Sequence, residues 1–414
     1  MKLVFTFSIR ILALVVSSHS PVFGEDWLQF RGSGSAGVGK GTLPRTWNDE
    51  ENIIWKTALP GVGASSPVVV GNKVFLTAGV GGSEDLVRKL ICIDLTNGKQ
   101  LWEKTVASEL PEVETVREDH GYTSATPVAS ETNLFVFFGK SGVSCFDHDG
   151  NLKWNTKVGS TLNRWGSAAS LVLHEDAVLV NACVESESLI ALNQSDGKER
   201  WKTPGLKECW HAPALATVDG KTRIIMGQAQ YVSAFDFETG KEVWRCKSGI
   251  SWYICPQPLV RDGVAYVIGG RSGIGGVAVK LGGTGDVTRT HRQWTLKQGT
   301  NVPSGVIHGD YLHYIHQDKG EAYAVNLKSG DFAYEENVQP GLGQVYASSL
   351  LVGDEILYLG RGGKAVIVKA GPKFKVVGSA KLENGRGVFN ASPAMVGGRL
   401  LIRSNKFLYC IGEK

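Results

Sequence analysis

Short apolar runs alternate with polar turns along most of the chain, and the pattern recurs about every 44 residues from residue 65 onward. Each period opens with small residues and, in most copies, a proline. Two strand-forming runs follow, such as residues 67–70 and 74–76 in the first period. A further apolar run, a turn and an aromatic residue then close the period. Runs of this length between turn residues predict about four β-strands per period.

The turn before the aromatic residue has a fixed composition in five periods. An Asp or Asn begins the turn, a Gly ends it, and the aromatic side chain lies four residues after the Gly. The five endings contain Asp94, Gly98 and Trp102; Asp147, Gly150 and Trp154; Asn193, Gly197 and Trp201; Asp236, Gly240 and Trp244; and Asn326, Gly330 and Tyr334. The Asp or Asn side chain can hydrogen-bond the turn backbone, and Gly adopts positive φ without steric cost. The pattern therefore predicts hairpins repeated in register.

Eight such units can be counted from their openings. The openings lie near Ser65, Ser124, Ser167, Trp210, Cys255, Val302, Tyr346 and Asn390. A four-stranded unit cannot bury both of its faces alone, so neighbouring units must stack into a closed ring. The last unit ends at Cys410 and Ile411 without an outer strand, and residues 52–56, before the first unit, resemble that missing strand.

We therefore predict an all-β fold, an eight-bladed β-propeller of four-stranded antiparallel blades closed by an N-terminal strand. Seven blades is the alternative, because the repeat weakens in the fifth and seventh units.

The recurring ending A-x-D-x-x-T-G-K-x-x-W, complete in residues 234–244, resembles the pyrroloquinoline-quinone-type (PQQ-like) propeller repeat. It recurs in residues 92–102 with Cys in place of the Ala and Asn in place of the Thr. Residues 27–32 read W-x-Q-F-R-G and resemble the opening of exported propeller proteins of the planctomycete-type group. Residues 278–288 are similar to another signature of that group. The resemblance covers nearly all of the mature chain and implies the propeller fold.

The resemblance implies a scaffold and does not by itself imply a cofactor. Quinoprotein alcohol dehydrogenases with this repeat are longer, carry a disulfide between adjacent cysteines, and use a catalytic Asp with calcium ligands. The chain has no Cys-Cys pair, and no residues match those ligands one for one. An outer-membrane assembly lipoprotein shares the fold without chemistry, but it has a lipidated cysteine that this chain lacks. We expect no catalytic residue, metal or cofactor, with pyrroloquinoline quinone plus calcium as the alternative.

The first 24 residues are typical of a secretory signal peptide. An uncleaved N-terminal anchor is the alternative, although the apolar run is short for a membrane span. Residues 25–49 are a predicted N-terminal capping segment, and residues 50–414 the propeller. The formal charge of +4 becomes +2 once Lys2 and Arg10 are removed, which argues against nucleic acid as a partner. We expect a periplasmic or secreted protein with no transmembrane segment in the mature chain.

Cysteine and tryptophan positions follow the repeat. Cys92, Cys145 and Cys410 occupy a column that holds Ala in other units, which indicates a small buried site. Cys209 and Cys255 fall near equivalent points of neighbouring units, and an export compartment would permit a disulfide between them. Six tryptophans at the outer-strand position are predicted to pack between blades: Trp55, Trp102, Trp154, Trp201, Trp244 and Trp294.

Candidate binding residues lie where the innermost strand of each blade begins, because that point faces the central channel of a propeller. The residues predicted at this channel mouth are Tyr122, Trp165, Trp210, His211, Trp252, Tyr253, Asn301, Gln344, Tyr346, Arg386 and Asn390. Aromatic faces with amide and guanidinium donors suit a planar or sugar-like ligand, or a peptide. The alternative is that these side chains fill the channel and hydrogen-bond one another.

These observations predict an exported, non-catalytic binding or scaffold propeller that engages a protein partner or a small carbohydrate-like ligand through the channel mouth. A quinone-dependent or carbohydrate-acting oxidoreductase is one alternative, and a structural module of an envelope assembly is another. An acid–base catalytic pair could be drawn from Glu118, Asp119 and His120. Adjacency in sequence does not place such side chains face to face, however. Trp27 and Phe30 are expected to pack on the outside of the propeller.

Overall fold

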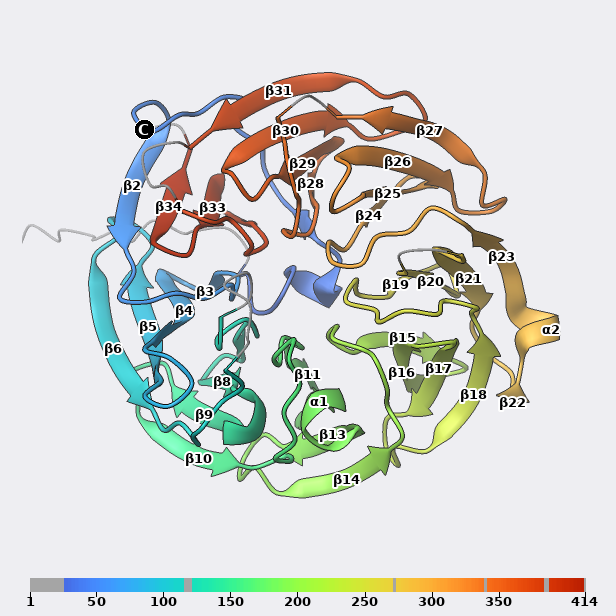
Figure 1. Cartoon of the computed structure of the whole chain (residues 1–414), viewed down its shortest axis with the longest axis horizontal. Coiled ribbons are helices and arrows are strands. Elements are labelled where there is room, and N and C mark those ends of the chain that lie inside the picture. The colour runs from blue at the N-terminus through green and yellow to red at the C-terminus, as the bar shows by residue number, and fades with distance from the viewer. Residues whose placement is uncertain (1–25, 115–120, 271–272, 339–340, 383–386, 413–414) are drawn as a thin grey trace, which may run out of the picture.

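The strands of the molecule are arranged as a ring of sheets around a central axis (Figure 1). The computed structural model describes residues 26–114, 121–270, 273–338, 341–382 and 387–412. Within these ranges the strands form eight sheets. Each sheet is one blade, whose first strand lies nearest the axis, and consecutive strands of a blade pair antiparallel.

The blades follow one another in chain order. Blades 1 to 4 contain β3 (Val68–Val70), β4 (Lys73–Val80), β5 (Val87–Asp94) and β6 (Gln100–Val106); β7 (Val128–Ala129), β8 (Asn133–Phe137), β9 (Val143–Asp147) and β10 (Leu152–Thr156); β11 (Val172–His174), β12 (Ala177–Ala182), β13 (Ser188–Asn193) and β14 (Glu199–Pro204); and β15 (Ala214–Val218), β16 (Lys221–Gln228), β17 (Tyr231–Asp236) and β18 (Glu242–Lys247). Blades 5 to 8 contain β19 (Leu259–Arg261), β20 (Val264–Ile268), β21 (Gly276–Lys280) and β23 (Arg292–Leu296); β24 (Val306–His308), β25 (Tyr311–Ile315), β26 (Glu321–Asn326) and β27 (Phe332–Asn337); β28 (Leu350–Val352), β29 (Glu355–Leu359), β30 (Lys364–Lys369) and β31 (Val376–Lys381); and β32 (Ala394–Val396), β33 (Arg399–Arg403), β34 (Phe407–Ile411) and β2 (Ile53–Ala58).

Two short strands extend this plan. β1 (Val38–Gly39) pairs in parallel with β28 of blade 7, and β22 (Gly285–Asp286) pairs in parallel with β18 of blade 4. The described helical turns are η1 (Ser33–Ser35), η2 (Gly139–Ser141), α1 (Cys183–Ser186) and α2 (Thr288–His291). Among the described residues, no helix is long and apolar enough to cross a bilayer.

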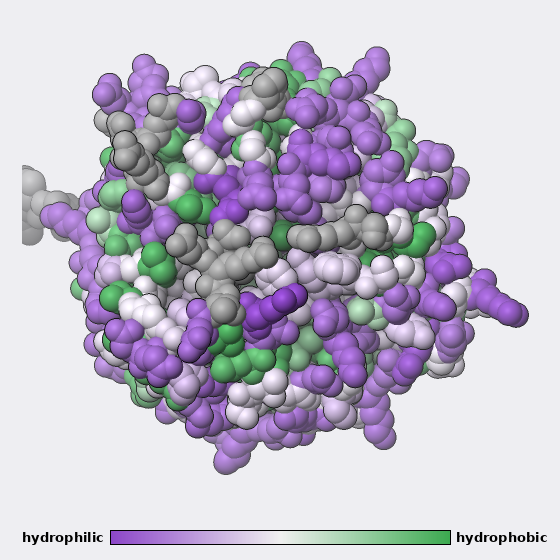
Figure 2. All heavy atoms as spheres, viewed as in Figure 1, coloured by the Kyte–Doolittle hydropathy of each residue, from purple (hydrophilic) through white to green (hydrophobic). Residues whose placement is uncertain are grey.

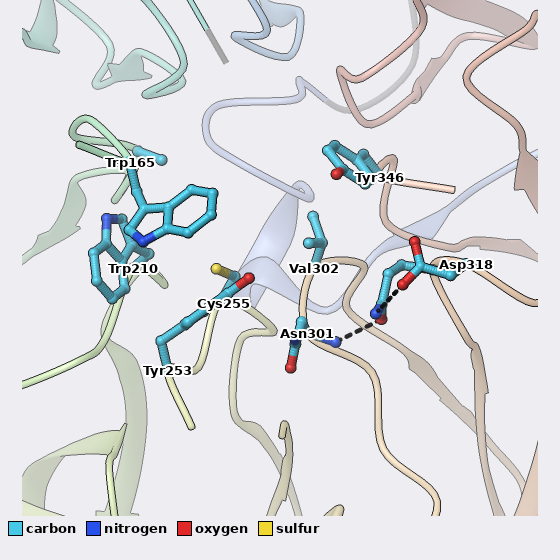
Figure 3. A pocket seen from close by; sticks show the side chains of 10 residues that line it. Trp165, Trp210, Tyr253, Cys255, Asn301, Val302, Asp318 and Tyr346 are labelled. Atoms are coloured by element: carbon cyan, nitrogen blue, oxygen red, sulfur yellow. Dashed lines mark hydrogen bonds between the residues drawn. The ribbon is translucent and has the colours of Figure 1, made fainter. Parts of the chain in front are cut away.

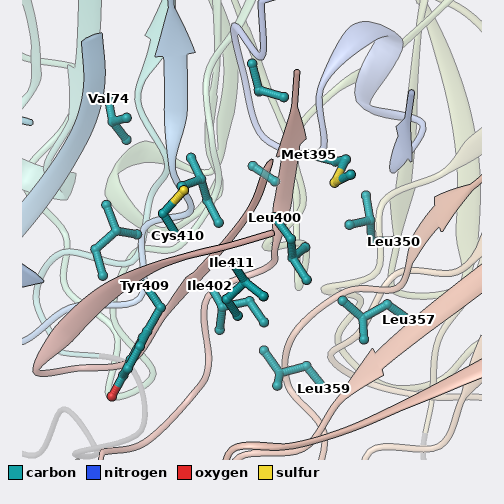
Figure 4. Close-up of a cluster of buried hydrophobic side chains, with 14 of the residues drawn as sticks. Val74, Leu350, Leu357, Leu359, Met395, Leu400, Ile402, Tyr409, Cys410 and Ile411 are labelled. Atoms are coloured by element: carbon teal, nitrogen blue, oxygen red, sulfur yellow. The ribbon is translucent and has the colours of Figure 1, made fainter. Parts of the chain in front are cut away.

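A strand from the N-terminal side of the repeats closes the ring. β2 pairs antiparallel with β34, and Trp55 faces Cys410 across this pair. Blade 8 therefore joins the two ends of the propeller. The apolar core at this junction combines side chains from blades 1, 7 and 8, including Val74, Leu357 and Ile411 (Figure 4). The prediction of eight blades closed in this way is confirmed, and the seven-blade alternative is wrong.

Tryptophans on the outer strands join one blade to the next, as predicted. Four indole Nε1 groups donate to the backbone carbonyl that follows the Asp or Asn of the next blade's turn: Trp55 to Leu95 (2.9 Å), Trp154 to Gln194 (3.0 Å), Trp201 to Phe237 (2.9 Å) and Trp294 to Leu327 (2.9 Å). The indole also covers the turn glycine, since a Cβ on Gly197 would lie 2.5 Å from the Trp154 ring. Gly197 has a φ of +71°. The turn therefore needs glycine for its positive φ and for the close approach of the indole.

The small-residue column lies opposite the aromatic column within each blade. Cys92 faces Trp102 across the β5–β6 pair, and Ala191 faces Trp201 across the β13–β14 pair. Both small residues are fully buried. Burial raises the pKa of the Cys92 thiol to about 12, so this cysteine stays protonated and serves as packing. The predicted small buried site is confirmed.

Hydroxyl groups link the innermost strands around the channel. Within the described ranges, a backbone N–H of one blade donates to a Ser or Thr hydroxyl of the next blade at six junctions: Ser66 to Thr126 (2.9 Å), Thr126 to Ser170 (3.0 Å), Gln257 to Ser304 (3.0 Å), Ser304 to Ser348 (3.1 Å), Ser348 to Ser392 (2.9 Å) and Ser392 to Ser66 (3.0 Å). Ala212 occupies the corresponding position of blade 4 and has no hydroxyl. The last of these bonds closes the ring on its inner side, as β2 does on its outer side.

The N-terminal segment enters the central channel. Trp27 is buried, and its backbone pairs with Val69 of β3 through bonds of 2.8 and 3.0 Å. Phe30 lines the channel. Arg31 is fully buried and donates to the carbonyls of Ser304 and Gly305, which lie just before β24. The expectation that Trp27 and Phe30 pack on the outside is wrong, because the carbonyls near the inner strands supply the acceptors that the guanidinium of Arg31 needs (Figure 1).

Polar side chains dominate the periphery of the face shown in Figure 2, and apolar atoms appear there only in small groups. Most apolar side chains of the strands lie between blades. Aromatic side chains gather at the channel mouth, as described below.

Substitution of Trp55 by Ala is expected to destabilise the protein by about 3–5 kcal/mol, because it removes a buried indole and its bond to Leu95 at the closing blade. The urea midpoint followed by far-ultraviolet circular dichroism measures this change. Leu152→Ala on the outer strand β10, where the side chain is 60% exposed, is the control and should change stability by less than about 0.5 kcal/mol. Equal effects of the two substitutions would contradict the role of the outer tryptophans.

Candidate functional site

A pocket opens at the centre of the ring, where blades 3 to 7 bring their inner ends together (Figure 3). Its lining consists of Trp165, Ala168, Trp210, Tyr253, Cys255, Asn301, Val302, Gln317, Asp318 and Tyr346. The empty space among these side chains is about 730 Å³, counting the open mouth. Part of this space is open solvent above the side chains, so the pocket is a shallow hollow and not an enclosed cavity.

Aromatic rings form two facing walls of this pocket. Tyr253 contacts Trp165 at a centroid distance of 6.0 Å, and it meets Trp210 edge-on at 5.6 Å. The Trp210 indole donates to the carbonyl of Gly166 at 2.9 Å, which fixes its orientation. Tyr346 stands on the opposite side (Figure 3). A flat ligand can thus contact aromatic faces from both sides.

The floor of the pocket carries an amide without a partner. The Asn301 side chain is 0% exposed, and neither its oxygen nor its nitrogen has a hydrogen-bond partner among the described residues. Its backbone is fixed, because the Asn301 N–H donates to the Gln317 side-chain oxygen at 2.8 Å. The Thr300 hydroxyl donates to the same oxygen at 2.7 Å. Asn301 therefore carries a donor group and an acceptor that no described residue satisfies.

Both a negatively charged and a positively charged side chain lie around the pocket. The Asp318 carboxylate accepts one bond from Gln317 at 3.0 Å and one from Gln344 at 2.9 Å. The guanidinium of Arg361 lies 4.5 Å from the centroid of the Tyr346 ring. Arg361 also donates to Gln344 at 2.8 Å and to Asn390 at 3.0 Å. An amide and guanidinium network therefore holds the rim on the blade 7 side.

The structure brings together five of the predicted residues as pocket lining: Trp165, Trp210, Tyr253, Asn301 and Tyr346. Gln344 and Asn390 lie at the rim through their bonds to Arg361. Tyr122 lies elsewhere, in a smaller hollow, where its hydroxyl donates to the carbonyl of Val113 at 2.9 Å. Trp252 is 44% exposed and lies beside Tyr253 at 5.9 Å, outside the lining.

Some predicted residues cannot be placed. Arg386 lies outside the described residues, and so do Glu118, Asp119 and His120. The proposed signal peptide, residues 1–24, lies outside them as well.

His211 has a structural environment. Its ring is buried, with Nδ1 2.8 Å from the Ala212 carbonyl, and with Nε2 2.7 Å from the Gly227 carbonyl and 3.1 Å from the Gly227 N–H. A neutral ring can donate to one of these two carbonyls. Burial lowers the pKa of His211, which favours this neutral form. His211 therefore fixes the backbone behind Trp210.

Sequence reasoning missed Phe30, Gln317, Asp318 and Arg361. Gln317 and Asp318 lie between β25 and β26, and Arg361 lies between β29 and β30. The turn between the second and third strands thus reaches the channel mouth, as the start of the first strand does. Reading this second loop in every repeat would have identified Gln317, Asp318 and Arg361, whereas Phe30 lies in the N-terminal segment outside the repeats.

The pocket residues do not form a calcium site. Calcium takes about six to eight oxygen ligands, commonly including several carboxylates. Asp318 supplies the pocket's lining carboxylate, and both of its oxygens already accept amide bonds. Across the described ranges, no group of three or more His, Cys, Asp or Glu side chains converges to hold a metal. These donors therefore fit a polar organic ligand better than a quinone with calcium.

A buried carboxyl group lies near the pocket wall. Glu185 belongs to α1, on the inner side of blade 3, and the Ser167 hydroxyl donates to its carboxylate (Figure 1). Burial raises the pKa of Glu185 to about 7. The folded protein therefore carries this group close to its titration midpoint at neutral pH.

The wild-type protein is expected to lose stability as pH rises, because Glu185 ionises at a buried site. Glu185→Gln should abolish this loss. The folded pKa of about 7 exceeds the ordinary value of 4.5, so the folded state binds this proton more tightly and stability falls between pH 4.5 and 7. The difference between the two pKa values corresponds to about 3 kcal/mol in the free energy of unfolding. In urea unfolding, the Gln variant should match the wild type near pH 4.5 and exceed it above pH 7. Glu187→Gln, at an exposed neighbour, should keep the wild-type profile. Identical profiles for all three proteins would contradict the assignment.

A family model described as outer membrane protein assembly factor BamB matches residues 39–208, 88–336 and 228–411. Among solved structures, BamB from Moraxella catarrhalis is 13% identical, with a TM-score of 0.64 over 87% of this chain and 99% of that chain. Sqt1 from Chaetomium thermophilum is 11% identical, with a TM-score of 0.64 over 88% and 100%. Quinohemoprotein alcohol dehydrogenase from Comamonas testosteroni is 10% identical, with a TM-score of 0.63 over 94% and 81%. A comparison with curated proteins finds no match. Identities this low show a common fold only.

Proposed function

Because the chain belongs to the PQQ-like propeller family whose model is described as outer membrane protein assembly factor BamB, we propose that it is an exported, non-catalytic binding propeller. Its working surface is the aromatic pocket at the channel mouth. The Asn301 amide carries this proposal, because it is buried in the pocket and has no partner among the described residues. Leaving such a group unpaired costs about 1–3 kcal/mol. A ligand that hydrogen-bonds the amide would offset this cost.

The ligand proposed for the pocket is a small, neutral, carbohydrate-like molecule. Hydroxyl groups both donate and accept, so they can satisfy the oxygen and the nitrogen of Asn301 together. The apolar face of a sugar ring can lie against Trp165 or Tyr346. A cation would approach the guanidinium of Arg361, and an anion would approach the carboxylate of Asp318. The mixed charges of the pocket therefore favour a neutral ligand.

Export remains part of the proposal and rests on the signal-like composition of residues 1–24. The description of the matched family supports the same location, because it concerns an outer membrane assembly factor. A role in an envelope assembly would use the same fold as a scaffold.

Asn301→Leu is expected to abolish ligand binding without reducing stability. Calorimetric titration of the mature protein with glucose, mannose and N-acetylglucosamine measures binding, and thermal melting measures stability. The substitution removes an unpaired buried amide, so the free energy of unfolding should stay constant or rise by up to about 3 kcal/mol. Binding of none of these sugars by the wild type would overturn the carbohydrate ligand.

Asn181→Leu provides the matched control. Asn181 is also buried, but its side-chain nitrogen donates to the His211 carbonyl at 2.9 Å and its oxygen accepts from the Cys183 N–H at 3.1 Å. This substitution should therefore destabilise the protein. A comparable destabilisation by Asn301→Leu would show that Asn301 is a structural residue. Titration with pyrroloquinoline quinone plus calcium completes the test, since a saturable rise in melting temperature would favour the quinoprotein alternative.

A further inference from the structure

Two cysteine side chains that are distant in sequence meet beside the pocket wall. Cys183 begins α1, and Cys209 lies between β14 and β15, directly before Trp210. Both belong to one buried cluster between blades 3 and 4, together with Leu206. The Cys209 thiol donates to the side-chain oxygen of Asn181 at 3.8 Å, and the same oxygen accepts from the Cys183 N–H. All seven cysteines lie in described ranges, and all are free thiols in the structure.

The side chain of Asn181 holds these two cysteines in place. Its oxygen accepts from the Cys183 N–H at 3.1 Å, and its nitrogen donates to the Cys209 carbonyl at 3.3 Å. The same nitrogen lies 3.7 Å from the Cys209 sulfur. The Cys183 thiol also donates to the Leu206 carbonyl at 3.6 Å. A single amide thus fixes the backbones that carry both sulfurs.

Cys255, which sequence reasoning paired with Cys209, is placed differently. The backbone of Cys209 forms a parallel bridge with Ile254, one residue before Cys255. Successive side chains of an extended strand point to opposite sides. Ile254 packs into the core between blades 4 and 5, whereas Cys255 lines the central pocket. The geometry therefore favours Cys183 as the partner of Cys209.

A small reagent can reach this pair from one side. Cys183 lines a hollow of about 1020 Å³, open solvent included, which is bordered by Leu162, Glu208 and Trp210. Cys183 is 8% exposed, whereas Cys209 is 1% exposed. The neighbouring Cys209 side chain lowers the pKa of the Cys183 thiol, whereas the Cys183 side chain and burial raise the pKa of Cys209 well above its ordinary value. Cys183 is therefore the attacking sulfur and Cys209 the resolving one.

We propose that Cys183 and Cys209 form a reversible dithiol–disulfide pair that joins α1 to the segment carrying Trp210. The oxidant is a small disulfide such as glutathione disulfide. The Cys183 thiolate attacks one sulfur of that disulfide, forms a mixed disulfide and releases one glutathione thiolate. Cys209 then gives up its proton, attacks the Cys183 sulfur and releases the second glutathione. The protein loses two thiol hydrogens and two electrons, and one glutathione disulfide becomes two glutathione molecules.

This pair would set the rigidity of one pocket wall. Trp210 directly follows Cys209, and its indole contacts Tyr253 within the aromatic wall. A covalent bond to α1 removes the freedom of that segment to separate from blade 3. An oxidising compartment would keep the bond formed, and a reducing one would open it. The inference stands independently of the ligand proposed above.

Peptide mapping of the mature full-length protein tests the proposal. Fully reduced protein is equilibrated with mixtures of reduced and oxidised glutathione under native conditions, blocked with iodoacetamide and digested without reductant. We expect a linked peptide pair that contains Cys183 and Cys209, and a fall in free thiols by two from the seven of the reduced protein. The melting temperature should rise on oxidation, because the bond constrains the unfolded chain.

Single substitutions separate this pair from the other cysteines. Cys183→Ser should abolish the link, while Cys255→Ser should leave both the link and its midpoint redox potential unchanged. Retention of all thiols by folded wild-type protein in excess glutathione disulfide would overturn the proposal. A linked peptide pair joining Cys209 to Cys255, or a link that forms only in urea, would overturn it equally.

Discussion

The contact between an outer-strand indole and the glycine turn of the next blade is the interaction on which the ring depends. Burying an aromatic side chain of about 150–250 Å² contributes roughly 4–6 kcal/mol, whereas the Nε1 hydrogen bond adds about 1 kcal/mol. Packing therefore dominates, and the bond to a carbonyl such as that of Leu95 mainly fixes the orientation of the ring. Because a Cβ on the turn glycine would strike the indole, the two residues define one contact. The hydroxyl bonds around the channel repeat this coupling at the inner ends of the blades, at six junctions within the described ranges.

A ring built this way can position single side chains from many blades around one space. Trp165, Asn301 and Tyr346 precede the first strands of blades 3, 6 and 7, and all three line the central pocket. None of these residues is needed for the contacts between outer strands, so the pocket can vary while the scaffold stays intact. The Asn301 amide, which has no partner among the described residues, shows the same separation, because such a group lowers stability unless a bound molecule satisfies it.

The sequence contains most of the fold but only part of the site. Repeated turns such as 94–98 and the matching strand at 52–56 predict the blades and their closure, because hairpin chemistry is local. The channel residues are predictable where they keep a fixed distance from a repeat, as Trp210 does. Arg361 lies in the loop between the second and third strands of its blade, away from the strand openings used for the prediction. The position of the N-terminal segment depends on carbonyls far along the chain, which accept from Arg31. Whether a polar group such as Asn301 finds a partner is a three-dimensional property with no signal in its neighbours.

The buried Arg31 has a consequence for the order of events during synthesis. Its guanidinium is satisfied by carbonyls of Ser304, Gly305 and Ser349, more than 270 residues later in the chain. Strand β2 likewise pairs with β34, which lies near the end of the described chain. The first part of the propeller to leave the ribosome is thus the last to find its place. Until those residues have been synthesised, Arg31 and β2 lack the partners that they have in the folded ring.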